Sequence, residues 1–158
     1  MPLMYMLIGV PGSGKSTWIA TSAADDGTTI ISSDKYIEAY AKLAGKAYSD
    51  VFTEYAESAQ NLANKDLELA IEGGRHIIWD QTNLSVRLRM TRLAKVPDNY
   101  TKIAVYFQTP PADVLAARLT SRPGKTIPRY VVDKMIGNLE PPSLGEGFTR
   151  IFNVRNFE

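Results

Sequence analysis

Residues 9–16 of this 158-residue chain read Gly-Val-Pro-Gly-Ser-Gly-Lys-Ser, which fits the pattern G-x-x-x-x-G-K-[ST] at every fixed position. An apolar run, Leu3–Ile8, precedes the motif, and a helix-like segment follows it. This context is typical of a loop whose backbone N–H groups surround phosphates. The alternative is a glycine-rich turn with an incidental lysine. The residues that we expect to contact phosphate are Gly9, Pro11, Gly12, Ser13, Gly14, Lys15, Ser16 and Thr17.

The remainder of the chain alternates strand-like with helix-like segments. Strands are expected at Leu3–Ile8, 28–32, His76–Trp79, Thr101–Phe107 and 148–154. Helices are expected at 16–24, 34–43, 51–71, 85–95, 110–121 and 130–139, with a loop at 122–128. This alternation predicts an α/β fold, namely a doubly wound parallel five-stranded sheet with helices on both faces. The length predicts one domain, residues 1–158, with a lid at about 118–128.

Composition excludes several classes of site and leaves the kind of partner open. The chain has no cysteine and one histidine, His76, which excludes disulfides, thiol nucleophiles and histidine-rich metal sites. No apolar run is long enough to span a membrane, and no signal peptide is recognisable, so we expect no membrane partner and a cytoplasmic location. Residues 81–130 carry nine basic and two acidic side chains. This excess is either a basic binding surface or a solvated face.

The glycine-rich motif indicates nucleotide binding but does not define the reaction. An N-K-x-D motif, by which a GTPase reads its base, is absent, and a large ATPase module needs a longer chain. A small kinase that uses ATP and Mg²⁺ fits the length best. Lys15 is then expected to contact the β- and γ-phosphates, and the Ser16 hydroxyl to bind Mg²⁺.

Polar residues follow the second and third expected strands, where ligands bind in doubly wound sheets. Asp34 is placed to be the general base of a kinase, and the alternative is a helix N-cap. Asp80 follows three apolar residues and is a candidate to act on Mg²⁺ directly or through water; the alternative is a cap or turn residue. Thr82 and Asn83 either contact substrate or cap the helix that follows.

Basic residues are grouped in two places. Arg118 and Arg122 are four residues apart, which predicts one helix face immediately before a Pro/Gly loop. There they can neutralise a transferring phosphate or form an ordinary solvated face. The second group could hold a polynucleotide backbone or be a solvated helix surface, and Arg89 and Arg92 are its candidate substrate residues. This group is Arg87, Arg89, Arg92 and Lys95. Aromatic residues between 36 and 55 are expected to be partly core, with one or two available to stack on a base.

Four segments together resemble the kinase domain of phage polynucleotide 5′-kinases and related small P-loop kinases. They are residues 9–18, 31–36, 77–84 and 118–122. The resemblance implies Lys15 and Ser16 on phosphate and Mg²⁺, Asp34 as general base and Arg122 as the lid arginine. It also implies ATP as donor and a nucleic-acid hydroxyl as acceptor, on DNA in preference to RNA, in the host cytoplasm if the chain is phage-encoded.

The chain departs from this family at position 37. Such kinases often carry an arginine three residues after the base aspartate, and this chain has Ile37. Recognition of the acceptor is therefore expected to differ. A related group phosphorylates the hydroxymethyl group of 5-hydroxymethyluracil in phage DNA, and this activity is the first alternative. A kinase of a small metabolite or antibiotic and a non-catalytic ATP-binding module are the further alternatives.

Overall fold

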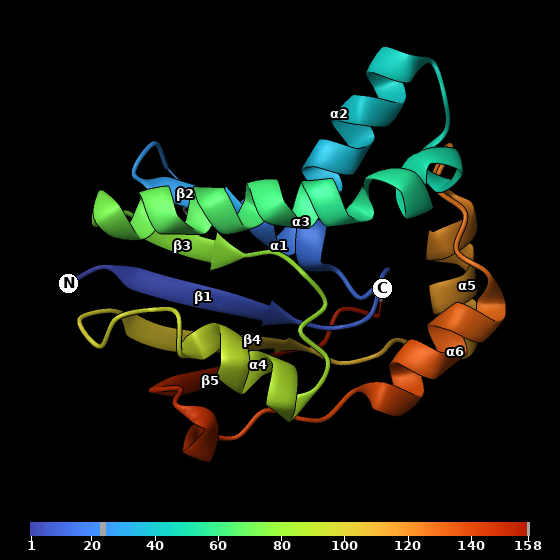
Figure 1. Ribbon diagram of the computed structural model, residues 1–158. Helices are drawn as coiled ribbons and strands as arrows, with labels where there is room; N and C mark the ends of the chain where they lie inside the picture. The colour runs from blue at the N-terminus through green and yellow to red at the C-terminus, as the bar shows by residue number, and fades with distance from the viewer. Residues whose placement is uncertain (23–24, 158) are drawn as a thin grey trace.

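The computed structural model describes residues 1–22 and 25–157, and it contains one sheet whose paired strands all run parallel. The strand order is β2-β3-β1-β4-β5, so the strand that leads into the glycine-rich motif lies at the centre (Figure 1). The strand bounds are β1 Leu3–Ile8, β2 Thr28–Ile31, β3 His76–Trp79, β4 Thr101–Phe107 and β5 Arg150–Val154. Buried on both faces, the central strands read as nearly continuous apolar runs, as expected for a parallel sheet.

Six α-helices and one 3-10 helix lie in the described part of the chain. Their bounds are α1 Lys15–Thr21, α2 Asp34–Ala44, α3 Tyr48–Glu72, α4 Val86–Leu93, α5 Ala112–Thr120, α6 Arg129–Asn138 and η1 Leu144–Glu146. The longest, α3, buries Ala59, Ala63 and Leu67 at intervals of four residues, which places them on one helix face. Gly45 follows α2 in the left-handed region (φ 66°) and ends that helix.

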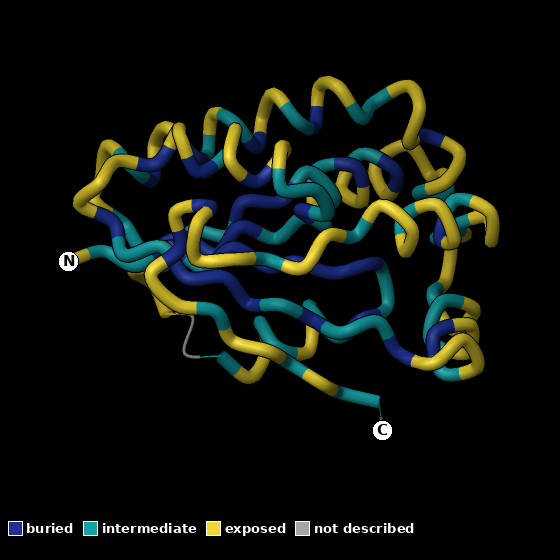
Figure 2. The backbone as a smooth tube through the Cα atoms, turned by 90° about the horizontal axis from the view of Figure 1, so that it is seen from below, coloured by how far each residue is buried: buried dark blue, intermediate teal, exposed yellow. Residues whose placement is uncertain are grey.

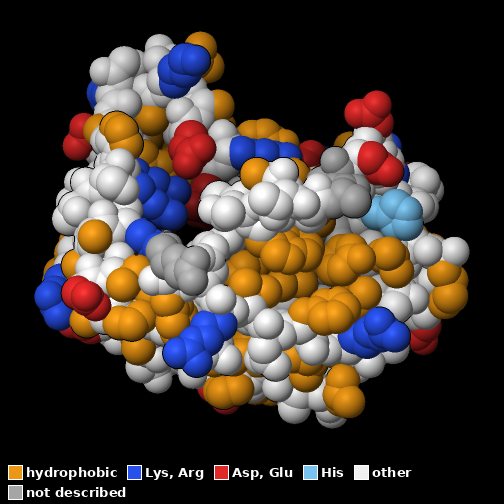
Figure 3. Space-filling model, turned by 180° about the vertical axis from the view of Figure 1, so that it is seen from behind, with side chains coloured by type: hydrophobic (Ala, Val, Ile, Leu, Met, Phe, Trp, Pro, Cys, Tyr) orange, Lys and Arg blue, Asp and Glu red, His pale blue; other side chains and the backbone are white. Residues whose placement is uncertain are grey.

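The two faces of the sheet are covered differently. Helices α3 and α4 lie over one face, where Met4, Met6 and Ile8 of β1 pack with Leu67 and Leu93. Buried residues accordingly gather in the strands and on the inner sides of these helices (Figure 2). On the other face, α1 contributes Trp18 and Ile19, and apolar side chains remain visible from outside (Figure 3). Partly buried members of this surface are Tyr5, Trp18, Ile30 and Val154.

The expected fold class is confirmed: an α/β fold with a five-stranded, all-parallel sheet and helices on both of its faces. Most helix boundaries differ from expectation by one or two residues, and three differences bear on the site or on the described range. The expected helix 16–24 is observed at Lys15–Thr21, with residues 23 and 24 outside the described part. The helix expected to begin at residue 51 begins at Tyr48. Helix α5 ends at Thr120, so Arg122 lies beyond it and not on the same helix as Arg118.

The topology brings the candidate functional segments to one edge of the sheet. The carboxyl ends of β1, β2 and β3 lead respectively to the glycine-rich loop, to Asp34 and to Asp80. Because parallel strands end at the same edge, the three segments meet there. Residue 158 of the expected single domain lies outside the described residues. No described helix is long and apolar enough to cross a membrane.

Candidate active site

The loop between β1 and α1 requires glycine for two reasons. Gly12 and Gly14 have φ angles of 84° and 109°, a region that residues with a Cβ atom rarely adopt. At Gly9 the limit is space, because a Cβ atom would lie 2.6 Å from Ser13 Oγ and 2.9 Å from Phe107 Cβ. The motif therefore specifies a particular loop shape, and α1 begins immediately after it at Lys15.

The Lys15 ammonium lies over this loop. Its Nζ donates hydrogen bonds to the carbonyl oxygens of Gly9 (2.7 Å) and Val10 (3.1 Å). Burial lowers the pKa of Lys15 from 10.5 to about 8, against the opposing effect of the Asp80 carboxylate. The Lys15 ammonium group can exchange these two carbonyl contacts for contacts with phosphate oxygens. The negative phosphates would also favour the charged form of Lys15.

A cavity of about 1120 Å³ extends from this loop to the junction of α2 and α3. One end, which we call the donor end, is lined by Gly12, Gly14, Lys15, Ser16, Thr17, Arg118 and Asn156. The other end, which we call the acceptor end, is lined by Ser33, Asp34, Lys35, Glu38, Tyr48, Phe52, Asp80 and Gln81. A volume above the usual range for one small ligand can accommodate a nucleotide together with part of a second molecule.

Asp34 faces the acceptor end and bonds to side chains instead of capping a helix. It is the first residue of α2, and the N-cap position of that helix is Ser33 and not Asp34. Its Oδ1 accepts from the Tyr48 hydroxyl, and its Oδ2 lies 3.0 Å from Lys125 Nζ. Burial, together with this hydrogen bond, raises the pKa of Tyr48 well above its usual range. Tyr48 therefore stays protonated and fixes the orientation of the carboxylate as a donor.

The segment 122–128, here called the lid, is attached to the first turn of α3. Ser49 Oγ donates to the Thr126 carbonyl (3.0 Å) and accepts from the Thr126 amide (2.9 Å). Lys125 extends from this segment to Asp34 and also to Glu38 (3.3 Å), and its Nζ lies 4.4 Å from the centre of the Tyr48 ring. The lid thus reaches the predicted base directly.

The two candidate lid arginines occupy the donor end by different routes. Arg118 of α5 donates to the Gly12 carbonyl (3.0 Å) and to the Asn156 carbonyl (2.6 Å). It thereby joins the glycine-rich loop to the segment after β5. Arg122 lines the same cavity from the lid. Its positive charge is close enough to Lys15 to contribute to the lowered pKa of that lysine.

The side chains around Asp80 suit a magnesium ion that the protein holds only in part. Burial raises the pKa of Asp80, and the Lys15 ammonium opposes this shift. The Ser16 hydroxyl is exposed to the same cavity. Within residues 1–22 and 25–157, no cluster of three or more His, Cys, Asp or Glu side chains could hold a metal by itself. One hydroxyl and one carboxylate fit an ion that takes its other ligands from phosphate oxygens and water.

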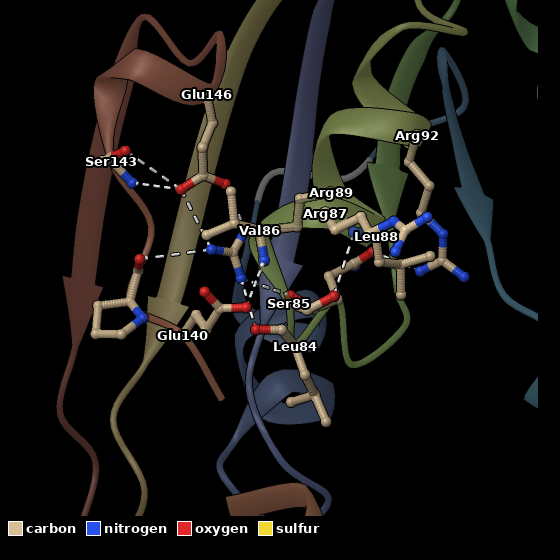
Figure 4. Close-up of polar contacts among 12 residues, drawn as sticks. Leu84, Ser85, Val86, Arg87, Leu88, Arg89, Arg92, Glu140, Ser143 and Glu146 are labelled. Carbon is tan, nitrogen blue, oxygen red and sulfur yellow. Dashed lines mark hydrogen bonds and ion pairs between the residues drawn. The ribbon is translucent and has the colours of Figure 1, made fainter. Parts of the chain in front are cut away.

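Three predicted substrate residues have structural roles instead (Figure 4). Arg89 is fully buried, and it pairs with Glu146 (2.7 Å) and donates to the carbonyls of Asn83 and Leu84. Asn83 is also fully buried and donates to the Leu7 carbonyl (2.8 Å). The expectation that Arg89 and Asn83 contact substrate is wrong, because their polar atoms are enclosed by the protein.

Arg92 is likewise committed to the protein. Its Nη1 donates to Asn83 Oδ1 (2.6 Å), and its guanidinium lies 5.6 Å from the centre of the Trp79 ring. Burial lowers its pKa to about 10. Arg92 is half-buried and already bonded to Asn83, and its role on a polynucleotide backbone stays a prediction. Together with Asn83 and Arg89, Arg92 holds the segment after β3, in which Thr82 lines the cavity and accepts a hydrogen bond from the Gly9 amide (3.0 Å).

The aromatic residues between 36 and 55 divide into two groups. Tyr40 and Tyr55 stack on each other at 4.4 Å with nearly parallel rings, and Tyr36 donates to Asp66. Tyr48 and Phe52 instead line the cavity. The sequence analysis missed Tyr48 and Lys125 as neighbours of Asp34. In the sequence, Lys125 could have been identified by its place in the loop that follows Arg122. Nothing beyond its aromatic character marked Tyr48.

Comparisons with known proteins agree with this architecture. The family described as an AAA domain matches residues 4–142. The chain is similar to a protein of Chloroflexus aurantiacus described as a candidate kinase, with a TM-score of 0.73, 18% identity and coverage of 98% of this chain and 85% of that one. It also resembles a gluconokinase of Sinorhizobium meliloti (TM-score 0.56, 20% identity, 98% and 82% coverage). A chain of the Pnkp1/Rnl/Hen1 complex matches at TM-score 0.54 and 23% identity over 82% of this chain and 41% of that chain.

Proposed function

Since the chain belongs to the AAA domain family and has the fold of P-loop kinases, we propose that it transfers the γ-phosphoryl group of ATP to an alcohol. One observation carries the proposal: Lys15 and Asp34 line the same cavity, one at each end. A cation for the phosphates and a carboxylate for the incoming hydroxyl are the two groups that phosphoryl transfer to an alcohol requires.

The proposed reaction assigns a role to each end of the cavity. The acceptor oxygen attacks the γ-phosphorus while its proton passes to Asp34. The bond from the γ-phosphorus to the bridging oxygen breaks, and ADP leaves with the electron pair. Lys15 and Arg122 offset the negative charge that develops on the phosphoryl oxygens. Tyr48 keeps Asp34 oriented by donating to Oδ1, and the acceptor hydroxyl takes the place of Lys125 at Oδ2.

ATP would occupy the donor end of the cavity. The backbone of residues 9–14 surrounds the phosphates, Thr17 and Ser16 follow at the start of α1, and Arg118 supports the loop from outside. Ser16 and Asp80 would hold Mg²⁺, with Asp80 acting directly or through water. When bound, this ion would supply positive charge that offsets the negative charge of the phosphates.

For the acceptor we propose a hydroxyl carried by a nucleic acid, with DNA preferred to RNA. The four segments shared with polynucleotide 5′-kinases support this choice, as does the cation pair Lys35 and Lys125 at the acceptor end. Ile37 is 1% exposed and packs in the core with Ala41 and Val51, so position 37 cannot supply a cation to substrate. The absence of a cation at position 37 supports an alternative acceptor, the hydroxymethyl group of 5-hydroxymethyluracil within phage DNA.

A small-metabolite kinase is the second candidate. The shared fold with a gluconokinase supports it, because the same architecture hosts a kinase of a small molecule. The burial of Arg89 and the partial burial of Arg92 also support it, because a polynucleotide then has fewer exposed positive groups to bind. Binding of a polynucleotide should weaken steeply with salt, whereas binding of an uncharged metabolite should not.

Transfer of label from γ-labelled ATP to a panel of acceptors tests the proposal. The panel contains a 5′-hydroxyl oligonucleotide, closed circular DNA with hydroxymethyl bases, and gluconate. We expect label on DNA and none on gluconate. Label on closed circular DNA identifies a base hydroxyl, since that substrate has no end. Label on gluconate alone would replace the nucleic-acid proposal, and label on nothing would indicate a non-catalytic ATP-binding module.

A further inference from the structure

We infer that Phe52 is a stacking surface for a planar ring of the acceptor, so that the accepting alcohol belongs to a nucleoside or a hydroxymethylated base and not to an open-chain sugar acid. The inference rests on the proposed function and defines its substrate class more narrowly. It concerns one residue of α3 that the reaction itself does not use.

Phe52 differs from the other aromatic residues of the α2–α3 region because its ring lines the cavity and contacts the Tyr48 ring at the edge of the core. Its side chain lines the acceptor end, and the residue is 45% exposed. Tyr40 and Tyr55 use each other's ring faces, and Tyr36 is bonded to Asp66. A large exposed ring at the cavity wall has an unfavourable contact with water, which a flat ligand would remove.

The position of Phe52 relative to Asp34 fits an alcohol attached to a ring. The Tyr48 side chain contacts both: its hydroxyl donates to Asp34, and its ring centroid lies 5.7 Å from that of Phe52. Because all three residues line one cavity, an acceptor whose hydroxyl meets Asp34 can place its next part against Phe52. In a nucleoside or a hydroxymethylated base, that next part contains a planar ring.

The surroundings of Phe52 offer polar groups to the edge of such a ring and a cation to a neighbouring phosphate. Thr53 and Gln81 line the cavity, and Lys125 lies over the Tyr48 ring. Stacking on an aromatic side chain tolerates any base, because every base has a π-face. A polyol would need hydrogen-bond partners here, and the face of a phenylalanine provides none.

The test compares acceptors with and without a ring. Phe52→Ala should raise the KM of a base-bearing acceptor about 5- to 150-fold, the effect of losing one base–aromatic stack. It should change the KM of the matching abasic acceptor much less. Phe52→Trp should restore affinity, and Phe52→Leu, which keeps an apolar side chain without a π-face, should not. Equal losses for both acceptors, or no loss, would overturn the inference.

Phe152→Ala is the matched control. Phe152 is 44% exposed, as Phe52 is, but it belongs to β5 and lies outside the residues that line the cavity. We expect this variant to leave both KM values unchanged. Thermal unfolding identifies any variant that does not fold. If Phe52→Ala does not fold, Phe52→Leu replaces it in the comparison.

A binding measurement separates this inference from the proposed function. Titration of the protein with thymidine and with 5-hydroxymethyluridine, followed by NMR or calorimetry, requires no turnover. Nucleoside binding that Phe52→Ala weakens would support the ring site even if no phosphoryl transfer is found. Absence of nucleoside binding by the wild type, or binding that Phe52→Ala leaves intact, overturns the ring site even if transfer to an alcohol is found.

Discussion

At the scale of single residues, Asp34 illustrates how one position acquires its chemical environment from distant parts of the chain. The carboxylate belongs to α2, its orienting hydroxyl to α3 and its cation to the lid. None of these partners is adjacent in sequence. The environment of the predicted base therefore depends on how three segments pack.

Replacing Asp34 by Asn tests its role in proton transfer. The amide oxygen can still accept from Tyr48, but the side chain no longer takes up a proton. We expect kcat to fall roughly 10²–10⁴-fold with little change in ATP affinity. Steady-state kinetics and ATP titration measure the two effects. Glu38→Gln is the control, because Glu38 shares Lys125 but lacks the Tyr48 contact; activity of Asp34→Asn close to that of wild type would exclude Asp34 as the base.

Lys15 should make ATP binding depend on pH. In the empty site its pKa is about 8, below its ordinary value, so part of the population is neutral above pH 8. Bound phosphates favour the charged form of Lys15, so ATP binding above pH 8 should be accompanied by proton uptake. At pH 6.5 Lys15 is already charged, and ATP binding should cause no proton uptake by this residue. Calorimetry in buffers of different ionisation enthalpy measures this uptake. Lys15→Arg should show none, since arginine stays charged throughout. The same uptake in this variant would assign the protons elsewhere.

Arg89 should matter for stability and not for acceptor binding. Removing one partner of a buried ion pair leaves the other without compensation, so Arg89→Met should reduce the free energy of unfolding by about 3–5 kcal/mol. Urea denaturation measures this loss. Arg87→Met on the exposed side of α4 should change it by less than about 0.5 kcal/mol. Equal effects of the two variants would contradict the structural role of Arg89.

The charge pattern of α4 shows why this role was not predictable. In the sequence, Arg87, Arg89, Arg92 and Lys95 look alike, and arginines on a short helix usually face water. The acceptor of the Arg89 guanidinium, Glu146, lies 57 residues later, and its place in a Ser143–Glu146 capping box predicts a turn but not a partner for Arg89. By contrast, the glycine-rich loop was predictable because its shape is set by residues inside the motif itself.

At the scale of elements, the strands and their order along the chain were predictable, but several helix boundaries were not. The strands are short apolar runs bounded by polar or glycine residues, and all five were expected. The start of α3 was missed because Tyr48 and Ser49 fall before its first buried residue, Val51. Those two residues face the cavity and the lid, so their positions are set by function-related contacts and not by the core.

The lid contact predicts a measurable effect on ATP hydrolysis without acceptor. Lys125 Nζ lies 3.0 Å from Asp34 Oδ2 and therefore competes with water for that oxygen. Lys125→Met should raise acceptor-independent hydrolysis by up to about 5-fold, the equivalent of about 1 kcal/mol for a partly exposed ion pair. Release of ADP in the absence of acceptor measures this. Ser49→Ala, which loosens the lid but leaves Lys125 intact, should have a smaller effect; an effect as large would assign the change to lid mobility alone.

At the scale of the whole molecule, the two ends of the cavity rest on different supports. The donor end follows directly from β1, the central strand, and is braced by the Gly9–Thr82 hydrogen bond. The acceptor end is built by α2, the start of α3 and the lid, and α2 and α3 pack on a separate cluster that includes Ile37 and Ala59. Helices α2 and α3, which line the acceptor end, meet beside the sheet (Figure 1).

Amide hydrogen exchange should detect this division. Strands β1, β3 and β4 should exchange most slowly, and residues 122–128 should exchange rapidly, because local stability follows burial and backbone pairing. Addition of ATP and Mg²⁺ should slow exchange in residues 9–17 and in the lid, with little change in β5. Lys15→Met should lose the protection that ATP adds, while amide exchange in β1, β3 and β4 should remain slow. Uniform protection across the whole chain would contradict a division between the two ends.

The lid spans this division. Arg122 lines the donor end, and Lys125, three residues later, bonds to the base at the acceptor end. A short segment with one side chain in each half cannot respond to one substrate without moving against the other. Occupancy of the two halves is therefore thermodynamically cooperative: whatever factor the acceptor contributes to the affinity for ATP, ATP contributes to the affinity for the acceptor.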